Sequence, residues 1–295
     1  MLRRTIQELE PTDERAVIIN VETKLVTTLA VMSALKYSGM NVLLIDCESK
    51  DGSLEYFSDL MKSYDFDLLP APLQRHGKTL DWVFTNIPAK KVLLIDSDVE
   101  ILGPEIIREL KRLIDNPAVF GTGFVHSPQW LTEPSGLGNE VGYYQERMWI
   151  PFTFLKVAYI QDALERNYSF ADRIFYNDFA PSQRIAKILY QRLHFRIFRN
   201  SRLLWLNLFK QAFNGLKPSY VYYDTGADIF QYLKYQRGYD FVGLPARLHT
   251  PYVTHFHGVT RLRQSPLDKN GTELKTIAIQ VQKRLKDVYA IDLPT

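Results

Sequence analysis

The chain has a single cysteine, Cys47, among its 295 residues, so it cannot form an internal disulfide. Such sparse use of cysteine is typical of proteins from a reducing compartment. No uncharged apolar run approaches the 18 residues that a membrane-spanning helix requires. The first fifteen residues are rich in charge and have no apolar segment of the kind found in a signal peptide. Together these absences predict a cytoplasmic protein.

Acidic residues are missing from Phe179 to Tyr223, and this gap explains the net charge of +3. The rest of the chain has 28 basic and 33 acidic residues, so the positive charge is local. Cations among bulky apolar groups are typical of an amphipathic helix that lies on an anionic membrane surface. The stretch could instead cover the core and offer Arg to a diphosphate. No nucleic-acid-binding motif accompanies it, so no nucleic acid is expected as a partner. The eight cations are Arg184, Lys187, Arg192, Arg196, Arg199, Arg202, Lys210 and Lys217.

Short β-branched or leucine-rich runs alternate with segments of helical periodicity over the first 115 residues. This alternation predicts an α/β fold with a mostly parallel sheet flanked by helices. In such sheets ligands bind beyond the carboxyl ends of the strands. The expected strands are 16–21, 41–46, 67–72 and 91–96, and the expected helices are 27–39, 52–66, 78–88 and 104–114.

The pattern loosens after residue 120. A strand is expected at 120–125, and a helix, a glycine turn and a short strand at 223–245. We expect an N-terminal extension (1–15), an α/β half (16–125) and a second half of the same domain (126–260). The second half contains a basic helical insertion near 181–217, and a C-terminal helical tail (261–295) follows.

Asp96, Ser97 and Asp98 form a D-x-D motif at the end of the buried run KVLLID. Two carboxylates beside one turn make an oxygen-rich site suited to Mg²⁺ or Mn²⁺. The aspartyl-phosphatase pattern D-x-D-x-[TV] is an alternative, but Glu100 stands at its fifth position. Surface acids without a role are a third interpretation, which the preceding apolar strand disfavours.

The second strand ends in Asp46-Cys-Glu-Ser49-Lys-Asp51-Gly-Ser53. Together with the D-x-D motif, this segment resembles the family 2 glycosyltransferases of the GT-A fold, whose second strand ends in D-x-x-S-x-D-G-[TS]. The resemblance is close over residues 15–125 and loose beyond them. Glu22 departs from the family pattern, because many members have a small or hydroxyl residue in that loop.

The resemblance implies a nucleotide-diphosphate sugar as donor substrate and a Mn²⁺ or Mg²⁺ ion. Residues 16–125 would then be the nucleotide-sugar-binding half, and residues 126–260 the acceptor-binding and catalytic half. By position, Asp46, Ser49 and Asp51 would lie in the nucleotide pocket. Asp96 and Ser97 would face the ribose or metal-bound water, and Asp98 would hold the metal. Lys78, in a basic glycine-containing loop before the third helix, would also contact the donor.

A carboxylate is needed as general base for the acceptor hydroxyl. The candidates are Asp224 and Asp228 in YDTGAD, at the start of an expected helix, and the choice between them is open. Asp-Thr-Gly is also the aspartic-protease triplet, but that enzyme needs two such triplets in β-rich lobes. A plain helix cap is the remaining alternative for Asp224.

His255 and His257 form an H-x-H pair after a short apolar segment. On an extended chain both imidazoles lie on one side, and the resemblance implies that one of them completes the metal shell of Asp98. The other histidines are expected to have no role.

The sequence therefore predicts a metal-dependent, inverting glycosyltransferase that acts on a carbohydrate or lipid-linked acceptor. It is expected in the cytoplasm, with peripheral attachment to a membrane. The alternatives are a sugar-nucleotide nucleotidyltransferase, whose glycine-rich loop after the first strand is absent here, and a non-catalytic nucleotide-sugar-binding protein.

Overall fold

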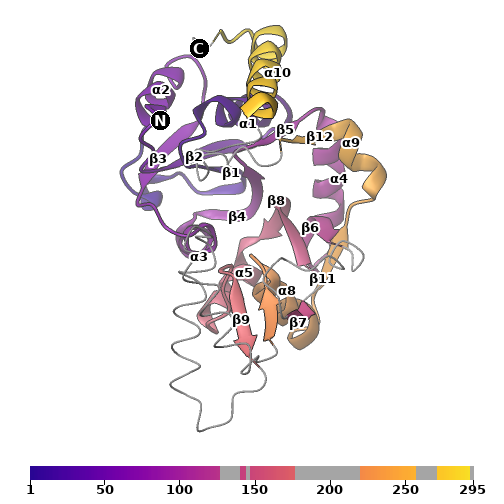
Figure 1. Cartoon of the computed structure of the whole chain (residues 1–295). Coiled ribbons are helices and arrows are strands. Elements are labelled where there is room, and N and C mark those ends of the chain that lie inside the picture. The colour runs from indigo at the N-terminus through magenta and orange to yellow at the C-terminus, as the bar shows by residue number, and fades with distance from the viewer. Residues whose placement is uncertain (127–139, 144–146, 177–219, 257–270, 293–295) are drawn as a thin grey trace, which may run out of the picture.

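The computed structural model describes residues 1–126, 140–143, 147–176, 220–256 and 271–292. A seven-stranded sheet in the order β11-β6-β8-β4-β1-β2-β3 forms the centre of this part of the chain (Figure 1). All neighbouring pairs are parallel except those of β8, which is antiparallel to both β4 and β6. The predicted mostly parallel α/β sheet is thus confirmed. The strands are β1 (Thr12–Asn20), β2 (Asn41–Cys47), β3 (Asp67–Ala71), β4 (Ala89–Asp96), β6 (Val119–His126), β8 (Arg147–Lys156) and β11 (Asp240–Gly243).

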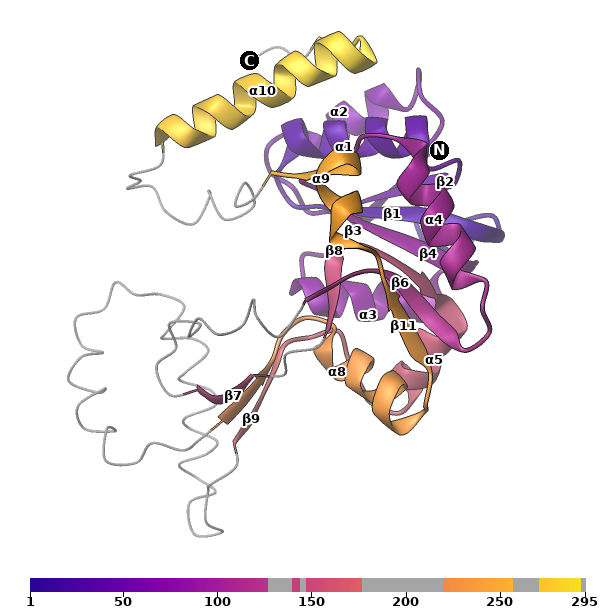
Figure 2. The same cartoon turned by 90° about the vertical axis from the view of Figure 1, so that its right-hand side faces the viewer.

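Helices cover both faces of the sheet (Figures 1 and 2). One face packs against α1 (Lys24–Tyr37), α2 (Ser53–Leu60) and α4 (Pro104–Ile114). The other face packs against α3 (His76–Asn86), α5 (Val157–Glu165) and α8 (Ala227–Gln231). Because both faces are buried, the central strands are apolar without alternation, as the VLLI runs of β2 and β4 show.

The helix boundaries follow local signals. Gly39 takes the left-handed conformation (φ +61°) just after α1, as predicted for a helix-terminating glycine. The helix predicted over 52–66 is shorter than expected, because α2 ends at Leu60. The chain then turns so that Phe66 is buried, with 2% of its surface exposed, immediately before β3.

Two small sheets and a C-terminal helix complete the described structure. In one sheet β5 (Val99–Ile101) pairs antiparallel with β12 (Val253–His255), which follows α9 (His249–Tyr252). The other sheet has the order β7 (Glu140–Tyr143), β10 (Tyr220–Tyr223) and β9 (Arg173–Tyr176). The last helix, α10 (Gly271–Tyr289), lies across α1 (Figure 2), and Val281 and Leu285 pack against Val26 and Leu29. The short helical turns are η1 (Ile6–Glu8), η4 (Tyr232–Gln236) and η5 (Ala246–Leu248).

Within the described ranges, no helix has both the length and the apolar composition that crossing a membrane requires. The basic insertion predicted near 181–217 lies outside these ranges.

Candidate active site

The carboxyl ends of β1 and β2 are joined by a buried polar network around Asn20. The Asn20 amide donates to Asp46 Oδ1 at 2.6 Å and to Ser49 Oγ at 3.0 Å. Its carbonyl oxygen accepts hydrogen bonds from the Thr23 and Thr27 hydroxyls at 2.9 and 2.8 Å. Asp46 is 1% exposed, and its second oxygen accepts the backbone N–H of Ser49. Asp46 therefore fixes the two loops at this edge of the sheet.

Both loops contain a strained residue. Glu22 and Glu48 have positive φ values of 54° and 50° although neither is a glycine. Left-handed backbone at such residues costs free energy and persists where the surroundings enforce it, often at functional sites. Here Ser49 Oγ accepts the backbone N–H of Glu22 at 2.8 Å, which ties the β1 loop to the β2 loop.

Asp51 lies between α1 and α2. One carboxylate oxygen accepts the Ser53 N–H and hydroxyl at 3.1 and 2.5 Å, and the other accepts the Lys24 N–H at 3.3 Å. Its role in the structure is to satisfy the first backbone N–H groups of the two helices. Gly52, with φ +74°, makes the sharp entry into α2.

The D-x-D motif occupies the turn between β4 and β5. Ser97 and Asp98 are buried, with 4% and 3% of their surface exposed, whereas the Asp96 side chain is 30% exposed. Ser97 Oγ accepts a hydrogen bond from Thr23, so the turn is joined to the Asn20 network. Burial raises the pKa of Asp96; the nearby imidazole of His76 opposes that shift, and the Asp98 carboxylate adds to it.

His76 is a residue to which the sequence gave no role. Its Nε2 lies 3.8 Å from Asp96 Oδ1, because the start of α3 faces the end of β4. No pattern near His76 in the sequence indicates this approach, which depends on how α3 packs beneath the sheet.

His255 lies against Asp98, as the sequence resemblance implied for one of the two C-terminal histidines. Strand β12 places His255 opposite Val99, and His255 Nε2 is 3.1 Å from Asp98 Oδ1. The imidazole is packed edge-on to Trp149, with ring centroids 5.2 Å apart. Its partner in the H-x-H pair, His257, lies outside the described residues.

The donor set near the D-x-D turn suits a hard divalent cation. Within the described ranges, no three His, Cys, Asp or Glu side chains converge into a ready-made metal-binding group. Mg²⁺ and related ions commonly take only one or two protein ligands and complete their shell with substrate phosphates and water. Asp98 and His255, two adjacent donors of which one is a carboxylate, fit a site of that kind.

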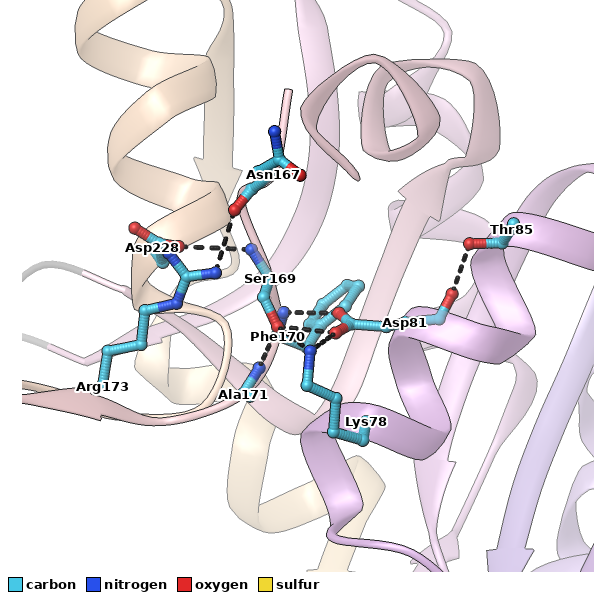
Figure 3. Close-up of polar contacts among 9 residues, drawn as sticks. All are labelled: Lys78, Asp81, Thr85, Asn167, Ser169, Phe170, Ala171, Arg173 and Asp228. Atoms are coloured by element: carbon cyan, nitrogen blue, oxygen red, sulfur yellow. Dashed lines mark hydrogen bonds and ion pairs between the residues drawn. The ribbon is translucent and has the colours of Figure 1, made fainter. Parts of the chain in front are cut away.

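Lys78, the predicted donor contact, points toward α5 and its following loop (Figure 3). Its Nζ lies 2.9 Å from Asp81 Oδ2 and donates to Ser169 Oγ at 3.3 Å. Asp81 also accepts the Ser169 hydroxyl at 2.6 Å and the Phe170 N–H at 2.7 Å. Asp81 therefore binds the start of α3 to the loop that leads into β9.

The same loop contacts Asp228, one of the two base candidates (Figure 3). Asp228 accepts the Ser169 N–H at 3.2 Å and pairs with Arg173 at 3.0 Å. Its side chain is only 5% exposed, and burial raises its pKa while Arg173 opposes that shift.

Asp224, the other candidate, is more accessible. Its side chain is 30% exposed and lies 2.9 Å from Arg147 at the start of β8. Its other oxygen accepts the Thr225 N–H at 2.7 Å, in the turn that leads into α8. Because β8 is antiparallel to β4, its first residues lie at the edge of the sheet where β4 ends. The structure thus brings Asn20, His76 and Arg147 to this edge in addition to Asp46, Asp96 and Asp98.

No family model matches the chain, and no curated protein matches it. Among solved structures, the chain is similar to glycosyltransferases of the GT-A fold, as its motifs predicted. Residues 1–349 of S. aureus TarS match with 16% identity and a TM-score of 0.37, over 51% of this chain and 48% of that one. A Pyrobaculum calidifontis mannosyltransferase in complex with GDP-Man and Mn²⁺ matches with 11% identity and a TM-score of 0.40, over 55% and 49%. Mouse xyloside xylosyltransferase 1 matches with 12% identity and a TM-score of 0.39, over 80% and 85%.

The chain thus spans about half the length of the TarS fragment and of the mannosyltransferase. Synthases, including a 4-diphosphocytidyl-2C-methyl-D-erythritol synthase, are among the similar structures as well. The similarity is one of fold, and the site described above stands on the geometry of this chain.

Proposed function

We propose that this chain is a metal-dependent glycosyltransferase that moves a sugar, with inversion, from a nucleotide-diphosphate donor to a hydroxyl acceptor. The observation that supports this most is the meeting of Asp98 and His255, 3.1 Å apart, beside Asp96 at the carboxyl edge of a parallel sheet. Ligands of such sheets bind at this edge.

In this proposal Asp98 and His255 hold Mn²⁺ or Mg²⁺, with Asp96 facing the ribose or metal-bound water. A divalent ion there would stabilise the negative charge that develops on the diphosphate leaving group. The nucleoside lies over the loops tied together by Asn20, Asp46, Ser49 and Asp51. Ser97 holds the D-x-D turn against α1, and Lys78 stands at the side of the donor.

Asp224 is the proposed general base. It is the more exposed of the two candidates, and Arg147 beside it orients the carboxylate. Asp228 is better suited to hold α8 against the 169–173 loop, because its side chain is 5% exposed and its Oδ2 contacts both the Ser169 N–H and Arg173.

The acceptor is proposed to be a carbohydrate or lipid-linked hydroxyl compound at an anionic membrane surface. This part rests on the acid-free sequence from Phe179 to Tyr223. Sedimentation with anionic and neutral liposomes at low and high salt tests it, since electrostatic attachment weakens with salt. Equal, negligible pelleting in all four conditions contradicts it.

A panel of nucleotide sugars tests the reaction itself. The protein is incubated with each donor and Mn²⁺, and both hydrolysis and transfer to simple sugars are followed. We expect release of a nucleoside diphosphate with at least one donor. Release of pyrophosphate from a sugar phosphate and a nucleoside triphosphate instead identifies a nucleotidyltransferase. Donor binding with no turnover under any condition identifies a binding protein.

A further inference from the structure

Glu100, two residues beyond the D-x-D motif, is a fully buried acid. Only 1% of its surface is exposed, and it is the middle residue of the three-residue strand β5. Arg284 of α10 binds Glu100 through two of its guanidinium nitrogens. Nε lies 3.0 and 2.9 Å from the two carboxylate oxygens, and Nη2 lies 2.5 Å from Oε1. The Tyr289 hydroxyl adds a third donor at 3.1 Å. A bidentate contact of this kind fixes both the orientation of the guanidinium group and its distance from the carboxylate.

The strand that carries Glu100 has little support of its own. β5 has three residues, and within the described part of the chain its one strand partner is β12, which also has three. An isolated two-stranded sheet is at best marginally stable in water, so its position depends on what packs around it. Val99 and Ile101 anchor it in the core on one side, and the Ile101 N–H donates to buried Ser33 of α1.

The same two strands hold the proposed metal ligands. Asp98 directly precedes β5, and His255 is the last residue of β12. The Phe256 N–H donates to the Asp98 carbonyl at 2.9 Å, which closes the ladder beside both ligands. Any shift of β5 relative to β12 therefore changes the 3.1 Å approach of His255 to Asp98.

Helix α10 contacts β5 directly and shares a hydrophobic cluster with the residue that follows β12. Arg284 and Tyr289 bind Glu100 on β5, and Phe256, adjacent to His255, packs against the cluster that includes Val281 and Leu285. The helix thus reaches the Asp98 side by a charged contact, and a hydrophobic cluster that α10 shares with α1 lies on the His255 side.

We propose that Arg284 and Tyr289 are positioning residues: through Glu100 they set the separation of Asp98 and His255 and so the affinity of the site for a divalent cation. The inference rests on the proposed function, because it assumes that these two side chains bind the metal. It adds a requirement for Arg284 of α10, which lies 184 residues beyond Glu100 in the sequence.

A purely structural role for the Glu100–Arg284 pair predicts something different. Loss of Arg284 would leave a buried charge unpaired and lower stability, but the molecules that remain folded would bind metal normally. The two roles are distinguished by metal affinity measured on folded protein.

Mn²⁺ binding is measured by electron paramagnetic resonance, with and without UDP or GDP, well below the unfolding midpoint of every variant. Arg284→Met is expected to weaken Mn²⁺ binding about tenfold or more, as loss of supporting residues around metal ligands does. Arg284→Lys should recover part of the affinity. Lys283→Met is the matched control, since it removes a cation from an exposed position of the same helix that pairs only with Asp287. Wild-type affinity in Arg284→Met, at whatever stability, overturns the proposal.

Hydrogen exchange separates this inference from the proposed function. Arg284→Met, or the milder Tyr289→Phe if the first variant does not fold, should exchange faster over residues 98–102 and 253–256 than wild type, with α3 and α5 unchanged. If wild type binds no Mn²⁺ but the exchange changes as stated, the metal assignment fails and the positioning of β5 by α10 stands. If exchange over both segments is unchanged, the positioning itself is wrong.

Discussion

Single aspartates at the carboxyl edge of the sheet differ in how easily an incoming ligand can reach them. Asp46 and Asp51 accept hydrogen bonds at both carboxylate oxygens, and Asp228 is buried with its Oδ2 bound by Ser169 and Arg173. Asp96 and Asp224 are each 30% exposed, so an incoming ligand can reach them. Residue type alone could not make this distinction, because all five are aspartates at the ends of strands or the starts of helices.

Replacement of the two base candidates should separate their roles. Asp224→Asn is expected to keep donor affinity and abolish transfer, since a general base acts only on the acceptor hydroxyl. Asp228→Asn should instead lower the free energy of unfolding by about 1–3 kcal/mol, because it removes the charged partner of Arg173 from a buried position. Initial rates and urea denaturation of both variants provide the measurements. Full transfer activity in Asp224→Asn, with loss in Asp228→Asn at unchanged stability, assigns the base to Asp228 instead.

Cys47 gives a test that needs no ligand. Burial, together with the adjacent Asp46 charge, raises the pKa of its thiol to about 12, from an ordinary value near 9. A rise of about three units lowers the thiolate fraction near pH 8 about a thousandfold, so native protein should react with iodoacetamide far more slowly than urea-unfolded protein. Because the folded state favours the neutral thiol, this contribution to stability is present below pH 9 and is lost as pH rises from 9 toward 12. Similar labelling rates for native and unfolded protein would contradict the buried position.

Among the elements, α3 and the loop between α5 and β9 depend on one carboxylate. Asp81 accepts hydrogen bonds from Ser169 and Phe170 and pairs with Lys78, all within 3 Å (Figure 3). Gly77 lies so close to this loop that a side chain there would meet the Ala171 backbone at 2.5–2.6 Å. The loop in turn binds Asp228 on α8, so Asp81 and this loop connect α3 to α8.

Asp81→Ala should therefore lower the free energy of unfolding by about 2–3 kcal/mol, because the buried Phe170 N–H loses its acceptor. Asp59→Ala is the control, since Asp59 is 75% exposed and pairs only with Lys62 on the surface of α2. Surface pairs of this kind contribute between 0 and about 1 kcal/mol. Urea denaturation compares the two variants, and equal effects would show that the loop does not depend on Asp81.

For the molecule as a whole, the sequence predicted the parallel strands of the first half of the chain. It did not predict the antiparallel strand β8 or the pairing of β5 with β12. The runs around VLLID identified β2 and β4 because strands buried on both faces are continuously apolar. The D-x-D motif singled out Asp98 as a candidate metal ligand, and the resemblance added one C-terminal histidine as a second candidate. The direct contact of His255 with Asp98 needed the pairing of β12 with β5, about 150 residues apart, which no local pattern encodes. The contact of Arg284 with Glu100 was missed for the same reason. The ion pair of Lys78 with Asp81 is local, three residues apart within α3, and was missed because Lys78 was expected to contact the donor instead.

The central claim is that the D-x-D turn and His255 form a divalent-cation site for a nucleoside diphosphate. Metal-dependent nucleotide binding tests this claim most directly. Calorimetric titration of UDP and GDP is carried out on wild type and on Asp98→Asn, each with Mn²⁺ and with EDTA. We expect wild type to bind one nucleotide at least about tenfold more tightly with Mn²⁺ than with EDTA, as loss of a bridging ion implies. Asp98→Asn should bind equally weakly in both conditions, with a fold that circular dichroism shows to be intact. Strong Mn²⁺-dependent binding retained in Asp98→Asn, or its absence in wild type with every nucleotide, contradicts the account.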